Sequence, residues 1–154
     1  MQGNATSTFR VAAVQFRSTA DIDDNVARIG DALRTCARDG VQVAAFPECA
    51  VTSYNARVVT KFSVERLRDA ERRLGTMCQK IGIAAVVGMP YYENDALYNG
   101  ALAWNRNGEL VARYAKIQLA ESWPRPGNRL VKFRLDGVPC SVIVCHDERY
   151  PELV

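Results

Sequence analysis

Apolar residues in the first half of the chain form short continuous runs that alternate with longer stretches of helical periodicity. The runs at 9–16, 41–46 and 83–88 predict buried strands. The stretches at 21–40 and 63–82 place apolar residues three or four positions apart, which predicts amphipathic helices. The order strand, helix, strand favours a parallel pair at the start of the fold.

Both predicted helices carry recognisable ends. Asp21 or Asp23 suits the N-cap of the first helix and Ser63 that of the second, because their side-chain oxygens can accept free backbone N–H groups. Gly40 stands where a left-handed residue commonly ends a helix, and the second stretch runs to Gly82. The charged residues between the apolar positions are expected to form solvated faces.

The pattern of apolar residues changes in the second half of the chain. Strand-like runs follow one another without helical stretches between them, at 96–104, 109–115, 129–135 and 138–145. Asn105–Gly108 and Asp136-Gly137 are strong hairpin signals, because Asn, Asp and Gly tolerate positive φ angles. The chain therefore reads as an α/β fold that begins parallel and acquires antiparallel hairpins.

Length, composition and charge narrow the class of protein. The chain has 154 residues, 48% of them hydrophobic and 24% charged, as expected of one globular domain. We expect residues 1–8 to form a polar tail and 9–154 to form the domain. The net charge of +3 is spread along the chain, which argues against nucleic acid as a partner. There is no apolar run long enough to span a membrane and no signal peptide, so a cytoplasmic protein is expected.

Cysteine and histidine usage restricts the chemistry further. The five cysteines form an odd set without Cys-x-x-Cys spacing, which predicts reduced thiols rather than disulfides or a zinc site. His146 is the single histidine, so no multi-histidine metal site can form, and neither metal nor organic cofactor is expected. If the chain were extended at Cys145, His146 would point away from it, and a packing role is favoured over a Cys-His pair.

Four reactive side chains stand where predicted strands end, which is where ligands collect in open α/β sheets. They are Glu48, Lys116, Glu121 and Cys145. Each also has a plain structural interpretation: the three charged residues as surface groups, and the cysteine as a small core residue. Position alone therefore makes them candidates only.

Three spaced motifs, in one order, distinguish between these interpretations. Phe46-Pro-Glu48, Arg113–Leu119 and Val144–Glu152 together resemble the nitrilase superfamily of carbon–nitrogen hydrolases. Further matching segments are Val11–Gln15, Leu97-Tyr-Asn99, Asn107-Gly108 and Arg125-Pro-Gly127. The resemblance runs from Phe9 onward and implies a nitrilase-like α-β-β-α sandwich whose subunits commonly associate.

The resemblance assigns roles residue by residue. It implies that Glu48 is the general base, Lys116 the oxyanion-stabilising cation and Cys145 the nucleophile. Glu121 would be a second, substrate-positioning glutamate, and the backbone N–H of His146 would help to hold the oxyanion. Two positions depart from the family pattern: Gln118 follows the lysine where histidine is often found, and His146 follows the nucleophile where tyrosine is commoner. Arg149 and Glu152 are expected to brace the turn after the nucleophile, and Cys49 is expected to be exposed without a chemical role.

The leading functional hypothesis is a hydrolase of small non-peptide C–N bonds that acts through a thioacyl intermediate. An amide or an N-carbamoyl amine is favoured over a nitrile as its substrate. The rival hypothesis is a catalytically incompetent nitrilase-like fragment that serves as an assembly or binding module, and a redox-sensing cysteine protein is a weaker third. Because the C-terminal part of the sandwich would be absent, strands such as 83–88 and 138–145 should lack cover and the chain should self-associate.

Overall fold

A computed structural model describes residues 8–153, so the predicted polar tail lies outside the described residues except for Thr8. In chain order the elements are β1 (Val11–Ala13), α1 (Ile22–Arg38), β2 (Val43–Ala45), α2 (Ala56–Val59), α3 (Val64–Ile81), β3 (Ala84–Glu93), β4 (Ala96–Trp104), β5 (Leu110–Ala115), β6 (Lys132–Leu135), β7 (Val138–Ser141) and the short 3-10 helices η1 (Cys145–Arg149) and η2 (Pro151–Leu153).

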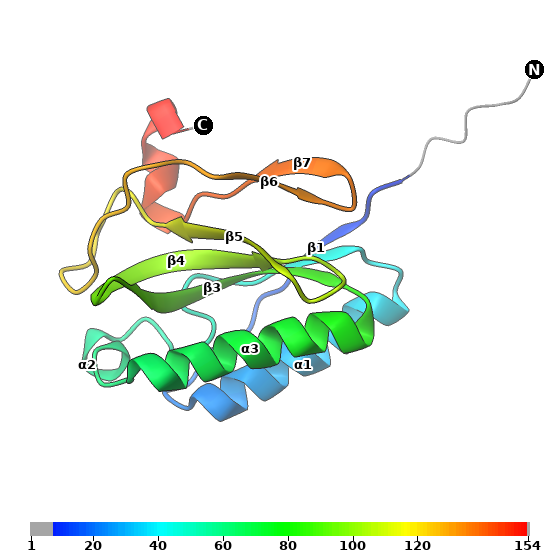
Figure 1. Cartoon of the computed structure of the whole chain (residues 1–154), viewed down its shortest axis with the longest axis horizontal. Coiled ribbons are helices and arrows are strands. Elements are labelled where there is room, and N and C mark those ends of the chain that lie inside the picture. Colours follow the sequence, from blue (N-terminus) through cyan, green and yellow to red (C-terminus); the bar gives the residue numbers. More distant parts are fainter. Residues whose placement is uncertain (1–7, 154) are drawn as a thin grey trace, which may run out of the picture.

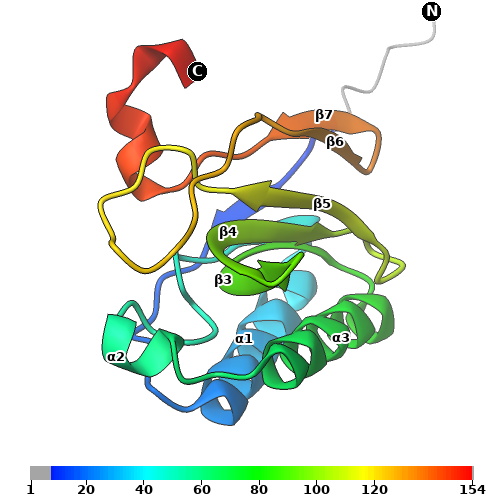
Figure 2. The ribbon, with the colours of Figure 1, turned by 60° about the vertical axis from the view of Figure 1, so that its left-hand side comes forward.

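A five-stranded sheet in the order β1-β2-β3-β4-β5 forms the centre of the molecule. The pairs β1-β2 and β2-β3 are parallel, and the pairs β3-β4 and β4-β5 are antiparallel. Helices α1 and α3 lie side by side on one face, and the β6–β7 hairpin lies over the other (Figures 1 and 2). The parallel start and the antiparallel continuation are both as predicted.

The two long helices begin and end as their capping residues predict. The Asp21 carboxylate accepts hydrogen bonds from the N–H groups of Asp23 and Asp24, so Asp21 is the N-cap of α1. The Ser63 hydroxyl accepts from the N–H of Arg66 at the start of α3, and Gly82 ends that helix with φ of 78°.

The core lies on both sides of the sheet. On the helix side, Leu33 of α1 and Leu74 of α3 pack with Val87 of β3, and all three are fully buried. On the other side, Phe133 and Leu135 of β6 cover the sheet. Strand β3 is therefore covered on both faces, and the prediction that the 83–88 run would lack cover is wrong. Large apolar side chains remain exposed at Val11 (55%) and Leu130 (42%).

The hairpin turns depend on positive φ angles. Gly108 has φ of 79°, and the Asp136-Gly137 pair has 48° and 82°, which confirms both predicted turns. A third turn at Asn94-Asp95, with φ of 48° and 59°, was not predicted, and it lets β3 continue to Glu93 instead of ending near 88.

Candidate active site

The predicted site residues gather at one edge of the sheet. Strands β2 and β5 run in the same direction, so their carboxyl ends meet at the left-hand end of the molecule in Figure 1. Glu48 follows β2 and Lys116 directly follows β5. Because β4 runs the other way, its first half lies at the same edge and carries Asn99.

Four side chains form a hydrogen-bonded cluster there, with Lys116 and Asn99 as donors and Glu48 and Glu121 as acceptors. Lys116 Nζ donates hydrogen bonds to Oε1 of Glu48 and to Oε1 of Glu121, at 2.7 Å each. Asn99 Nδ2 donates to the same two oxygens, at 2.8 Å each. The side chain of Lys116 is 0% exposed, that of Glu121 2% and that of Glu48 15%. Glu48 is therefore the acid of the cluster that is open to solvent.

Burial and charge act in opposite directions on this cluster. Burial lowers the pKa of Lys116, but the hydrogen bonds and charges of Glu121 and Glu48 outweigh it and raise that pKa above its ordinary value. Burial raises the pKa of Glu121, but hydrogen bonds from Lys116, Tyr54 and its own backbone hold it well below the usual range. Lys116 and Glu121 are thus both charged at neutral pH.

The turn that carries Glu48 packs directly on β3. A Cβ atom at Gly88 would lie 2.2 Å from the Pro47 carbonyl oxygen and 2.6 Å from Glu48 Cα, so only glycine allows this approach. Lys116 is held from both sides: its N–H donates to the Asn99 carbonyl oxygen and its own carbonyl oxygen accepts from Gly127, at 2.8 Å each. Backbone contacts therefore fix the positions of both Glu48 and Lys116.

Cys145 lies beside this cluster but not at the end of a strand. The predicted strand at 138–145 is too long: β7 ends at Ser141, and Cys145 opens η1 with φ of 48°. The thiol is exposed. Burial, then the charge and hydrogen bonding of Glu48, raise the pKa of Cys145, and the charge of Lys116 lowers it. The structure thus places Cys145 within electrostatic reach of both Glu48 and Lys116.

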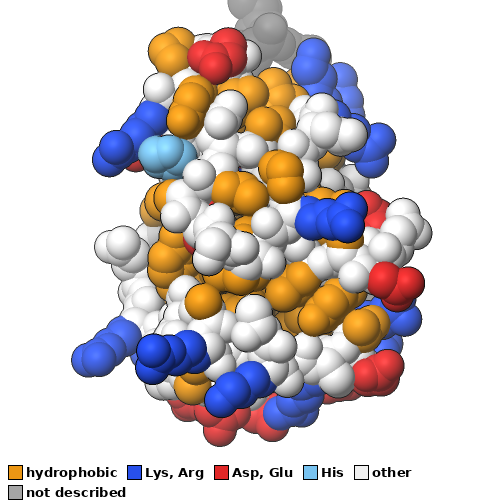
Figure 3. All heavy atoms as spheres, turned by 90° about the vertical axis from the view of Figure 1, so that its left-hand side faces the viewer, with side chains coloured by type: hydrophobic (Ala, Val, Ile, Leu, Met, Phe, Trp, Pro, Cys, Tyr) orange, Lys and Arg blue, Asp and Glu red, His pale blue; other side chains and the backbone are white. Residues whose placement is uncertain are grey.

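His146 follows Cys145 within η1, so the extended-chain geometry assumed for this pair does not hold. Its half-buried ring packs edge-on against Tyr150, with 5.5 Å between ring centroids. Figure 3 shows the end of the molecule that lies on the left in Figure 1, where a histidine side chain is visible at the surface.

Three expectations about neighbouring residues need correction. Cys49 is fully buried rather than exposed, and burial raises the pKa of its thiol. Arg149 and Glu152 are exposed, and neither forms an ion pair with any other described residue. The turn after Cys145 is braced instead by Asp147, whose buried carboxylate accepts four hydrogen bonds.

Sequence reasoning missed Asn99 and Asp147 as members of the site. Asn99 stands inside an apolar strand run, and a polar side chain in such a position must find a buried partner. That pattern could have pointed to Asn99. Asp147 lies in a polar stretch with charged residues on both sides, and nothing local distinguishes it from its exposed neighbour Glu148.

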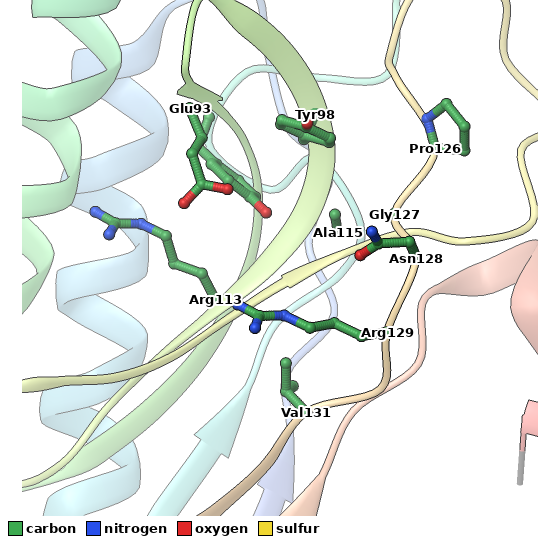
Figure 4. Close-up of a pocket in the computed structure, with 10 residues that line it drawn as sticks. Glu93, Tyr98, Arg113, Ala115, Pro126, Gly127, Asn128, Arg129 and Val131 are labelled. Carbon is green, nitrogen blue, oxygen red and sulfur yellow. The ribbon is translucent and has the colours of Figure 1, made fainter.

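A separate cavity of about 110 Å³ lies between the β3–β4 hairpin, β5 and the segment at 126–131. Tyr98, Arg113 and Arg129 line it (Figure 4). It contains none of the proposed catalytic residues. Within residues 8–153 there is also no group of three His, Cys, Asp or Glu side chains arranged to hold a metal ion, and no helix of that range has the length and hydropathy to cross a membrane.

The layers, the strand order and the site at the sheet edge define a chain of the nitrilase fold, as predicted. The chain superposes on an amidase from Nesterenkonia sp. AN1 with a TM-score of 0.89 and 26% identity, over 95% of this chain and 61% of that chain. The Nesterenkonia structure carries acrylamide added to its active-site cysteine. The pattern of the carbon-nitrogen hydrolase family matches residues 10–154, and the chain belongs to this family.

Two curated relatives are amidases. The omega-amidase NIT2 of Homo sapiens is 24% identical over 160 residues, which cover 96% of this chain and 58% of the relative. The 2-oxoglutaramate amidase of Bacillus subtilis is 27% identical over 118 residues, which cover 73% of this chain and 46% of the relative. The chain therefore spans roughly half the length of the relatives it matches.

Proposed function

We propose that this chain carries the catalytic machinery of an amidase that cleaves small, non-peptide amides through a thioester on Cys145. The observation that carries the proposal is the pairing of one buried ammonium, Lys116, with two carboxylates beside an exposed thiol. A thiol needs a nearby base and a nearby positive charge to act as a nucleophile at neutral pH. Glu48 and Lys116 supply one each.

In the first half of the reaction, Glu48 takes the thiol proton while Sγ attacks the amide carbon. Because both donors of the cluster end on Oε1 of Glu48, Oε2 is the oxygen left for the thiol. An ammonium has three N–H groups, and two of those on Lys116 are used by the carboxylates. The third donates to the developing oxyanion, together with the backbone N–H of His146. Protonated Glu48 then protonates the nitrogen, the C–N bond breaks and ammonia leaves.

In the second half, water replaces ammonia. Glu48 takes a proton from water as its oxygen attacks the thioester carbon, the C–S bond breaks, and the proton returns to the thiolate. The sum is amide plus water giving carboxylic acid plus ammonia. Glu121 stays ionised throughout and holds Lys116 in place, and from this position it would also orient the substrate.

The substrate class is supported by the two relatives and the solved structure described above, each of which is named as an amidase. An amide is therefore proposed ahead of an N-carbamoyl amine or a nitrile. All five cysteines are unpaired, which supports a reducing compartment such as the cytoplasm. The predicted homo-oligomer stays a prediction, which sedimentation velocity checks.

The test is ammonia release from a matched panel: butyramide, butyronitrile, N-carbamoyl-β-alanine and 2-oxoglutaramate. We expect ammonia from the amides first, and its complete loss in Cys145→Ser. Cys140→Ser, which removes a half-buried thiol away from the site, is the control and should keep the activity. Ammonia release that survives Cys145→Ser would contradict the proposal, and an inert chain with an unreactive Cys145 would favour the binding-module alternative.

A further inference from the structure

One buried carboxylate that the proposed chemistry does not use joins the two segments that carry Cys145 and Lys116. Asp147 is fully buried and accepts four hydrogen bonds. Its Oδ1 accepts from the backbone N–H groups of Ile117 at 3.2 Å and Gln118 at 2.7 Å, and its Oδ2 accepts from the Tyr114 hydroxyl at 2.6 Å and the Val144 N–H at 3.1 Å.

These partners come from both sides of the site. Ile117 and Gln118 directly follow Lys116, and Val144 directly precedes Cys145. The hydrogen bonds from Tyr114, Ile117 and Gln118 to η1 all end on the Asp147 carboxylate. One side chain therefore sets where the turn of Cys145 lies relative to the lysine segment.

The backbone at Cys145 needs such support. Its φ of 48° is in the left-handed region, which is unfavourable for a residue with a Cβ. The Val144 N–H bond to Asp147, together with the Asp147 N–H bond to the Val144 carbonyl oxygen at 3.1 Å, closes the turn around Cys145. Without these bonds the turn is expected to relax towards an ordinary extended conformation.

We propose that Asp147 is a positioning residue that holds the Cys145 thiol against Glu48 and Lys116. This inference rests on the proposed function, since the position of the thiol matters only if these groups act together. If the role of Asp147 were purely structural, its removal would change the stability of the chain but not the effect of the Glu48 charge on the reactivity of Cys145. That effect is the quantity to measure.

The pH midpoint for alkylation of Cys145 by iodoacetamide reports this effect. The charged groups that face the thiol are Glu48 after β2, Lys116 after β5 and Glu121 in the loop beyond it. The buried thiol of Cys49, next to Glu48, also lies within electrostatic range. Because the charge of Glu48 raises the pKa of Cys145, Glu48→Gln should lower the alkylation midpoint. The size of that shift measures how firmly the thiol is held at Glu48.

The experiment measures the Glu48→Gln shift in four backgrounds, with each thiol followed by peptide mass analysis. The otherwise unchanged chain should show the full shift. Asp147→Asn, which cannot accept all four bonds, should reduce it to a third or less, and Tyr114→Phe, which removes one bond, should give an intermediate value. Glu148→Gln, an exposed acid on the same turn, should keep the full shift.

The outcomes separate the two proposals. If Asp147→Asn fails to fold, Tyr114→Phe alone decides, and a full shift in that variant would overturn the role of Asp147. A full shift in folded Asp147→Asn would do the same while leaving the proposed function standing. If Glu48→Gln moves nothing in the otherwise unchanged chain, the proposed function itself is contradicted, and the role of Asp147 is overturned with it.

Discussion

Asn99 and Lys116 donate hydrogen bonds to the same pair of oxygen atoms, Oε1 of Glu48 and Oε1 of Glu121. Two carboxylates face one ammonium in this buried cluster, so their charges are not fully balanced. The amide of Asn99 supplies further hydrogen bonds without adding charge, which is how a buried polar cluster stays satisfied. Asn99 is therefore central to the stability of the site.

Asn99→Asp should destabilise the chain most at neutral pH. A third carboxylate beside two others raises the folded-state pKa of one of them, so the penalty is relieved as the pH falls through that raised pKa. We expect a loss of about 3 kcal/mol at pH 7 and a smaller loss at pH 5, measured by urea unfolding. Asn107→Asp, on an exposed turn, makes the same change in charge and should cost less than about 0.5 kcal/mol at both pH values. Equal losses for Asn99→Asp at both pH values would argue against the like-charge explanation.

The unchanged chain should show the opposite pH dependence. The folded-state pKa of Glu121 lies below its ordinary value of 4.5, so the stability it contributes is fully present above that value. This contribution is lost as the pH falls through the depressed folded-state pKa. Urea midpoints measured between pH 5 and pH 2 should fall by less in Glu121→Gln than in the unchanged chain. A parallel decline in both proteins would contradict the assigned pairing.

The five thiols should react with an alkylating reagent in the order of their exposure. Cys145 is exposed, Cys36 and Cys140 are half-buried, and Cys49 and Cys78 are buried. Burial raises the pKa of Cys78 to about 12 and that of Cys49 further. We expect Cys145 to be labelled first in the native chain and the two buried thiols only after denaturation. Early labelling of Cys49 would show that the turn after Glu48 opens in solution.

Removing the ammonium should slow the reaction of Cys145. The charge of Lys116 lowers the pKa of this thiol, so Lys116→Ala should move its alkylation midpoint to higher pH, opposite in sign to Glu48→Gln. Lys132→Ala, which removes an exposed cation on β6, is the control and should leave the midpoint unchanged. Equal midpoints for Lys116→Ala and the control would show that the charge of Lys116 does not act on the Cys145 thiol.

Gly88→Ala should destabilise the turn that carries Glu48. The added Cβ would meet backbone atoms of Pro47 and Glu48, which cannot move without shifting the turn, and we expect a loss of about 2–3 kcal/mol. Gly30→Ala is a matched control within α1, because its Cβ would meet the flexible side chain of Met77 at 3.0 Å. That variant should stay within about 1 kcal/mol of the unchanged chain in urea unfolding.

Much of the fold could be predicted because its rules are local. The caps at Asp21 and Ser63 and the turn at Asp136-Gly137 depend on residues only a few positions apart, so they can be read directly from the chain. The strand pattern likewise predicted the change from parallel to antiparallel pairing. Glu48, Lys116 and Cys145 were found through their motifs, and the placement of Glu48 and Lys116 at one sheet edge follows from the common direction of β2 and β5.

Long-range pairing decided the rest. Asn99 meets Glu48 across 51 residues of chain and Asp147 meets Tyr114 across 33, so both contacts depend on the register of the sheet and on the path of the chain after β7. The left-handed turn at Cys145 is likewise joined to the lysine segment by a long-range contact, the hydrogen bond from the Gln118 N–H to the Asp147 carboxylate. A buried polar side chain takes whichever partner the completed fold brings to it, and no pattern of neighbours along the chain specifies that partner.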